Sequence, residues 1–187
     1  KELKSCYEEC GEFIFPPLSP ISNLKMYPNF MPIDFIVNRR LIRQTKSYLE
    51  KKSRIKNILL MNNGTNSLSG VIEEIIKELP FNKKWNLLLR SECLSENLRE
   101  ITLRRKDVKV INGLSNVHLS IANSDLIVAR GGYNIVSEIL ALNKKSLIIE
   151  ERNNPEVLSN LKLIKDYPSI SLSSKENALN LLNDLIR

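Results

Sequence analysis

The chain has 187 residues, of which 42% are hydrophobic and 26% charged, a composition close to the globular average. Wholesale disorder, collagen and coiled coil are therefore excluded, and the length fits one domain with an attached arm. No window is apolar over the ~18 residues that a bilayer span requires. Because three cysteines (Cys6, Cys10 and Cys93) lack metal-ligand spacing and only one histidine is present, we expect free thiols, a cytoplasmic location, no metal site and no cofactor.

The net charge of +7 is concentrated in one segment. Eight basic residues fall between Arg39 and Lys56 against one acid, Glu50, on a helix predicted to begin near Asp34, and the rest of the chain is neutral. Such a basic helix either faces an acidic lipid surface or anionic phosphates, with peripheral membrane attachment as one outcome, or is a solvated helix face. Aromatic and basic residues do not interleave on the strands, so nucleic acid is not an expected partner.

The first 50 residues are predicted to be an inter-domain linker followed by this basic helix. Five of the eight prolines lie before residue 34, a density that forbids a long helix and favours extended chain. The sequence starts at Lys1 without an initiator Met or a signal-like stretch, so we expect a fragment of a longer protein.

Residues 51–187 form the second predicted unit, in which strands and helices alternate. The expected strands are 57–61, 85–89, 108–111, 125–129, 146–149 and 170–172. The expected helices are 68–79, 94–102, 116–122, 134–142, 156–165 and 176–185. Six strand-then-helix units with short connections predict an α/β fold, a Rossmann-like doubly wound parallel sheet of about six strands.

Ligands of such sheets bind at the carboxyl ends of the strands, near the switch in strand order. The first glycine-containing loop there, Met61–Ser67, combines Gly64 with small polar residues before a helix, which suits a phosphate. It lacks the Lys-Ser/Thr pair of a P-loop and the G-x-G-x-x-G fingerprint. On these residues alone, a strand-to-helix turn with an N-cap is the favoured explanation of the loop.

The second loop, residues 129–138, places Gly131 and Gly132 between a strand and a helix. Backbone amides there are expected to reach a diphosphate. Glu138 falls near the second helical turn, where a carboxylate can accept hydrogen bonds from the vicinal hydroxyls of a ribose. It is otherwise a solvent-facing helix residue, although Ile135 and Ile139 place it beside the apolar face.

The stretch Gly113–Glu138 resembles the nucleotide-sugar binding half of GT-B glycosyltransferases, in particular glycosyltransferase family 28, the MurG-like enzymes. Its Gly-Gly-Tyr-Asn-x-Val-x-Glu run is most similar to that of predicted bacterial glycosyltransferases in the same superfamily. The similarity extends over roughly Ile55 to Asn160. The fold implied by the resemblance is one half of a GT-B enzyme, and the ligand it implies is a nucleotide sugar, with UDP-sugar as the expected donor.

The resemblance also implies roles for single residues. Asn63, Gly64 and Thr65 correspond to the family's Gly-Gly-Ser loop near the donor phosphates, with Asn63 in place of the first glycine. Leu114 corresponds to the residue whose backbone recognises the uracil edge, and Val117 to one lining the base pocket. The diphosphate loop and helix end correspond to Gly131, Gly132, Asn134 and Ile135. Glu138 matches the ribose-binding glutamate, and Glu156 stands near the family's Gln pair for the donor sugar, with Val157 beside it.

In this family the acceptor site and the general base belong to a separate N-terminal domain. The resemblance therefore implies a glycosyltransferase whose catalytic residues lie outside this chain, so that this chain alone is inactive. His118, close to the predicted base pocket, is interpreted as a structural histidine because the sequence shows no acid partner for it. The residues themselves leave open a non-enzymatic membrane- or partner-docking module and a nucleotide-sugar hydrolase on the same scaffold.

Overall fold

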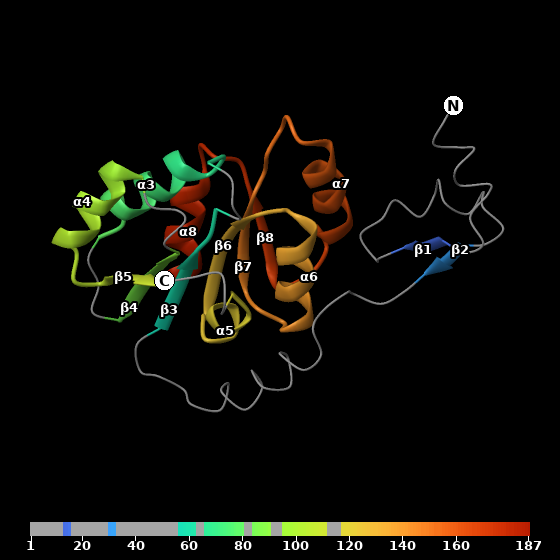
Figure 1. Ribbon diagram of the computed structural model, residues 1–187, viewed down its shortest axis with the longest axis horizontal. Coiled ribbons are helices and arrows are strands. Elements are labelled where there is room, and N and C mark those ends of the chain that lie inside the picture. Colours follow the sequence, from blue (N-terminus) through green and yellow to red (C-terminus); the bar gives the residue numbers. More distant parts are fainter. Residues whose placement is uncertain are drawn as a thin grey trace.

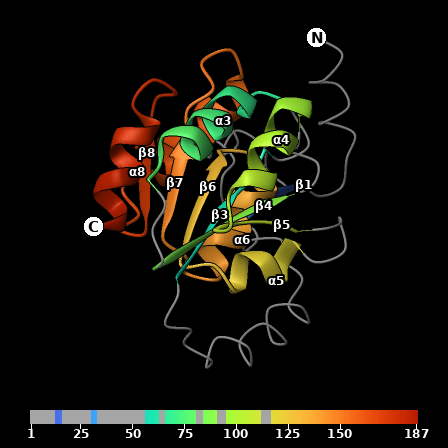
Figure 2. The ribbon, with the colours of Figure 1, turned by 90° about the vertical axis from the view of Figure 1, so that its left-hand side faces the viewer.

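The computed structural model describes residues 56–62, 66–80, 84–90, 95–111 and 117–187, together with the backbone of short strands at 13–15 and 30–32. Six strands form one parallel sheet in the order β5-β4-β3-β6-β7-β8 (Figures 1 and 2). Their bounds are β3 Lys56–Leu60, β4 Trp85–Arg90, β5 Val108–Ile111, β6 Leu126–Arg130, β7 Ser146–Ile149 and β8 Ile170–Ser173. The prediction of a doubly wound parallel α/β sheet is confirmed.

Each strand of the sheet is followed by a helix. The bounds are α3 Ser69–Glu78, α4 Glu96–Arg104, α5 Val117–Ala122, α6 Tyr133–Ala141, α7 Pro155–Ile164 and α8 Ala178–Ile186. All twelve elements were predicted from residue 56 onward, with bounds that differ by at most two residues. Helical and strand periodicities were therefore sufficient to locate the elements.

Two apolar cores lie on opposite faces of the sheet. On β3, Ile58 and Leu60 belong to the core shared with α3, α4 and α8, whereas Leu59, and Met61 just after the strand, belong to the core shared with α5, α6 and α7. Alternate side chains of a strand point to opposite faces, so a strand buried on both sides has a continuous apolar sequence. Figures 1 and 2 show the two groups of helices on either side of the sheet.

The N-terminal part of the chain contains a second, smaller sheet. Strands β1, Phe13–Phe15, and β2, Phe30–Pro32, pair in parallel, with Phe13 opposite Phe30. We expected extended chain here, and the pairing of these two segments was not predicted. The predicted basic helix lies outside the described residues.

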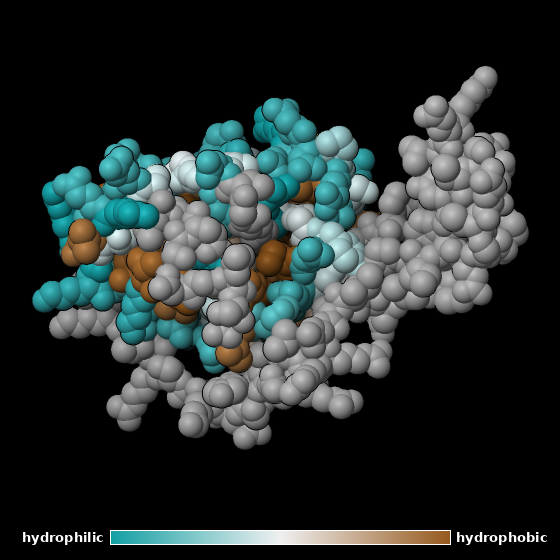
Figure 3. Space-filling model, in the orientation of Figure 1, coloured by the Kyte–Doolittle hydropathy of each residue, from teal (hydrophilic) through white to brown (hydrophobic). Residues whose placement is uncertain are grey.

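The described surface is largely polar on the face shown in Figure 3. Among the described residues, the exposed large apolar side chains are Leu103, Val110, Leu163 and Tyr167. No helix in this described part has both the length and the apolar character needed to cross a membrane.

Candidate functional site at the strand switch

The strand order reverses between β3 and β6, which pair in parallel at the centre of the sheet. The pairing continues past β3, where the Met61 N–H donates to the Val128 carbonyl at 2.9 Å. After β3 the chain crosses toward β4, and after β6 it crosses toward β7. The loops leaving these two strands therefore diverge, and they border the position where open α/β sheets bind ligands.

The loop after β3 is held by Asn62, a buried residue to which the sequence analysis gave no role. Its Oδ1 accepts from the Leu68 N–H at 2.9 Å, and its Nδ2 donates to Ser69 Oγ at 2.9 Å. The Lys175 ammonium, from the loop after β8, donates to the Ser67 carbonyl at 2.7 Å. Asn62 thus holds the turn that leads into α3, as the alternative explanation of this loop expected, but the expected N-cap is absent because Leu68, the N-cap residue, provides no side-chain cap. The candidate phosphate residues Asn63, Gly64 and Thr65 lie outside the described residues.

Gly131, at the end of β6, is packed beneath α7. A Cβ atom at this position would lie 2.9 Å from Leu161 Cδ2 and 3.3 Å from Val157 Cγ1. The Gly131 carbonyl accepts from Nδ2 of Asn160, a buried residue of α7, at 2.9 Å. Packing against α7 therefore accounts for glycine here, which we had predicted on the ground of close approach to a ligand.

Gly132 is the N-cap residue of α6 and is half-buried. The helix has neither a side-chain cap nor an acidic residue in its first turn. The same holds for α3 and α8, whereas α4 and α7 begin with side-chain caps from Ser95 and Asn154. Because the first N–H groups of a helix have no partner within it, the start of α6 offers donors and a positive dipole end to an anion.

Glu138, in the second turn of α6, faces α5 and pairs with the only histidine of the chain. His118 Nδ1 lies 3.1 Å from Glu138 Oε1, and the two side chains are 26% and 16% exposed. Burial raises the pKa of Glu138 above its ordinary value of 4.5, while His118 and the buried Arg90 at the end of β4 oppose that rise. His118 therefore has an acid partner, which the sequence did not reveal.

The second carboxylate oxygen of this pair is unsatisfied within the described part of the chain. Glu138 Oε2 is buried and has no hydrogen-bond partner among the described residues, and the same holds for the hydroxyl of Tyr133 at the start of α6. A buried acceptor without a partner costs free energy, so native proteins rarely keep one without a reason. A ligand hydroxyl that donates to Oε2 would supply that reason.

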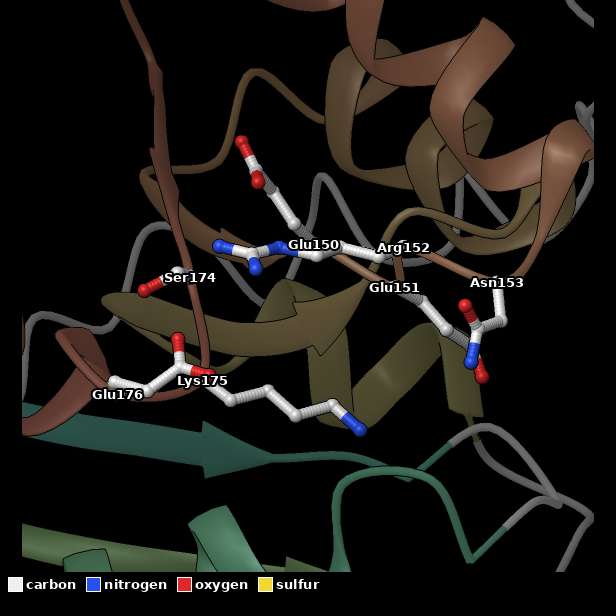
Figure 4. Close-up of a pocket in the computed structure, with 7 residues that line it drawn as sticks. All are labelled: Glu150, Glu151, Arg152, Asn153, Ser174, Lys175 and Glu176. Atoms are coloured by element: carbon white, nitrogen blue, oxygen red, sulfur yellow. The ribbon is translucent and has the colours of Figure 1, made fainter.

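Charged residues line the neighbouring edge of the sheet. Arg130, the last residue of β6, pairs with Glu151 at 2.9 Å, and both side chains are largely buried. A cavity of about 230 Å³ adjoins this pair beyond the ends of β7 and β8. Figure 4 shows the residues lining the cavity, which are Glu150, Glu151, Arg152, Asn153, Ser174, Lys175 and Glu176.

The remaining predicted residues that the structure describes belong to α5, α6 and α7. Val117 and Ile135 are half-buried against the core of that face, and Asn134 is exposed. Glu156 is exposed in the first turn of α7, where its charge complements the helix dipole. Val157 is completely buried in the core. The predicted uracil residue, Leu114, lies outside the described residues.

Sequence reasoning gave no role to Arg90 or Arg130 and did not find the acid partner of His118. Arg90 and Arg130 each end an apolar strand, and a charged residue in that position was the signal that could have identified them. His118 and Glu138 are twenty positions apart, and only the packing of α5 against α6 brings them together. Within the described parts of the chain, no group of three or more metal-ligating side chains is gathered that could hold a metal ion.

The sequence matches no protein-family model, and no curated protein is significantly similar to it. Its structure is similar to that of MurG from Acinetobacter baumannii, with 15% identity, a TM-score of 0.58, and coverage of 76% of this chain and 43% of MurG. It is also similar to the glycosyltransferase SnogD from Streptomyces nogalater, with 14% identity, a TM-score of 0.53, and coverage of 75% of this chain and 42% of SnogD. A third similar structure is LpCGTa, solved in complex with UDP, with 13% identity, a TM-score of 0.62, and coverage of 96% of this chain and 46% of LpCGTa.

The chain spans less than half the length of these solved structures. At such low identities the similarity concerns the fold, and sites and substrates do not follow from it. The six-stranded sheet with its alternating helices therefore has the architecture of one half of a GT-B glycosyltransferase.

Proposed function

We propose that this chain is the donor-binding domain of a glycosyltransferase and that it binds a UDP-sugar. The observation that carries the proposal is Glu138, whose Oε2 is buried without a hydrogen-bond partner among the described residues, beside the start of α6. A carboxylate that keeps one buried oxygen available at the strand switch is suited to accept from a ribose hydroxyl.

The uncapped start of α6 supports the binding of the diphosphate. Amide N–H groups after Gly132 have no partners within the helix, and no acidic side chain of the first turn competes with an anion. Arg130 is already paired with Glu151, so the proposal assigns the diphosphate to the amides of α6 and leaves this ion pair at the rim.

The rest of the reaction is assigned to a second domain. Less than half of each similar glycosyltransferase is spanned by this chain, and we propose that residues 1–50 connect it to an acceptor-binding domain that supplies the general base. In this proposal the loop at Asn63, Gly64 and Thr65 lies near the phosphates, Leu114 and Val117 hold the uracil, and Glu156 reaches the sugar.

Isothermal titration with UDP tests the proposal. We expect binding to the wild-type chain, and we expect Glu138→Ala to weaken it by roughly tenfold or more, the loss of hydrogen bonds to a charged acceptor. Glu73→Ala is the matched control, because Glu73 is a half-buried glutamate with one cationic partner, Lys77, on a helix of the opposite face. The Glu73→Ala variant should bind UDP with the wild-type affinity.

Two results would contradict the proposal. UDP that binds equally well to wild type and Glu138→Ala would remove the ribose assignment. A chain that ignores UDP and UDP-sugars but binds anionic vesicles in a salt-sensitive manner would instead favour a membrane-docking function of the basic segment 39–56.

A further inference from the structure

His118 is a half-buried side chain on a fixed platform. Its helix, α5, is short, but Ile121 and Ala122 at its C-terminal end are completely or almost completely buried. The Lys144 ammonium donates to the Ala122 carbonyl and, at 3.0 Å, to the Ser124 carbonyl, which ties the end of α5 to the loop after α6. The imidazole is therefore presented to α6 from a helix that is anchored in the core.

The chemistry of the pair determines which atom donates. An ionised carboxylate only accepts hydrogen bonds, so the hydrogen between Nδ1 and Glu138 Oε1 belongs to the imidazole. This bond fixes the ring orientation and occupies one lone pair of Oε1. Oε2 remains, buried and without a partner among the described residues.

A half-buried carboxylate needs such support. Burial disfavours its ionised form, and the groups that oppose this are His118 from α5 and Arg90 from β4. Arg90 acts through its charge, whereas His118 also makes a hydrogen bond and so restricts the rotation of the carboxylate. Of the two, His118 is the residue able to set the direction of Oε2.

We propose that His118 is a positioning residue for nucleoside recognition: its Nδ1–H holds Glu138 Oε1 so that Oε2 is aimed at the ribose hydroxyls. This role rests on the proposed function, since it concerns the same carboxylate. His118 itself does not touch the nucleotide, so its contribution reaches the ligand only through Glu138.

The positioning role predicts that substitution of His118 weakens the part of the binding affinity that comes from the ribose hydroxyls. Affinities for UDP and for 2′-deoxy-UDP are measured by titration calorimetry on the full chain. Wild type should bind UDP more tightly than 2′-deoxy-UDP. His118→Ala should reduce this ratio of affinities by roughly tenfold, mainly by weakening the binding of UDP. A purely structural histidine would change both affinities alike and leave their ratio intact.

Two conservative variants separate position from polarity. In His118→Asn the side-chain amide nitrogen lies near the place of the imidazole Nδ1, whereas in His118→Gln it lies near that of Nε2. We expect His118→Asn to restore most of the preference for UDP and His118→Gln to resemble His118→Ala. Asn123→Ala, an exposed position just beyond α5, is the control and should match wild type.

Nitrogen NMR of the one imidazole checks the pair without any nucleotide. Wild type should show the hydrogen on Nδ1 in the neutral ring, and Glu138→Ala should lose that preference. A neutral wild-type ring that carries its hydrogen on Nε2 and not on Nδ1 would overturn the positioning role. The role would also be overturned if His118→Ala kept the wild-type preference for UDP while Glu138→Ala lost UDP binding. That result would leave the proposed function standing. A wild-type chain that binds no UDP would overturn the proposed function and this role with it.

Discussion

Glu138 is the residue at which stability and the proposed binding conflict. Its carboxylate is held in a partly buried place where desolvation outweighs the attraction of His118 and Arg90, so its pKa is raised. A group whose folded pKa lies above its unfolded value binds protons more readily when folded. Its ionised form therefore lowers stability once the pH exceeds the unfolded value.

This sign predicts a pH-dependent gain from removing the charge. Glu138→Gln should melt at a higher temperature than wild type at neutral pH, and the difference should shrink as the pH falls toward and below 4.5, the ordinary pKa, because the wild-type carboxyl then becomes protonated. Differential scanning calorimetry between pH 4 and pH 8 measures it. A Glu138→Gln chain that is less stable at neutral pH would show that ion pairing outweighs burial.

The residue scale also shows where sequence reasoning ends. The spacing of Glu138 from Gly131 and Gly132 singled it out, and the structure places it partly buried beside α5. His118 was set aside because no acid stands near it in the chain. Its partner is spatial, and contacts between helices that are separated by a strand are not encoded in local spacing.

At the scale of elements, the start of α6 is fixed by α7. The space above Gly131 is filled by Leu161 and Val157, and Asn160 of α7 binds the Gly131 carbonyl. Two helices that pack this closely leave no volume for a side chain between them. The glycine and its asparagine partner set the position from which α6 begins.

Gly131→Ala should therefore destabilise the protein by about 1–3 kcal/mol, because its Cβ would displace the end of Leu161. In the double variant Gly131→Ala with Leu161→Ala, the second truncation makes room for the first. The double variant should consequently lose less unfolding free energy than the two single variants lose together, as measured in a double-mutant cycle from urea unfolding. Additive costs would mean that the alanine is accommodated elsewhere.

At the scale of the whole molecule, the sheet and its helices supply both cores. In the part of the chain whose side chains are described, every buried residue of the two clusters lies between Ile58 and Leu182. The outermost helix on one face, α8, contributes Ala178 and Leu182 to the core that it shares with α3. We propose on this basis that residues 51–187 form the donor-binding domain and that residues 1–50 are an attached linker and helix.

A truncated chain of residues 51–187 should fold cooperatively and bind UDP with the affinity of the full chain, since both cores are retained. A chain that ends at residue 177 should lose cooperative unfolding, because it lacks the buried side chains of α8. Circular dichroism melting curves compare the two. If the 51–187 chain fails to fold, the first 50 residues belong to the same unit.

The sequence by itself determined the class of fold and the place of each strand and helix from residue 56 onward. Apolar periodicity is a local property that each unit repeats, and glycines follow three of the six strands. Tertiary structure decided which residues meet: the pairing of β3 with β6, the packing of α7 over Gly131, and the contact between His118 and Glu138. These depend on strand order and on helix packing, which join positions far apart in the chain and leave no signal in the spacing of neighbouring residues.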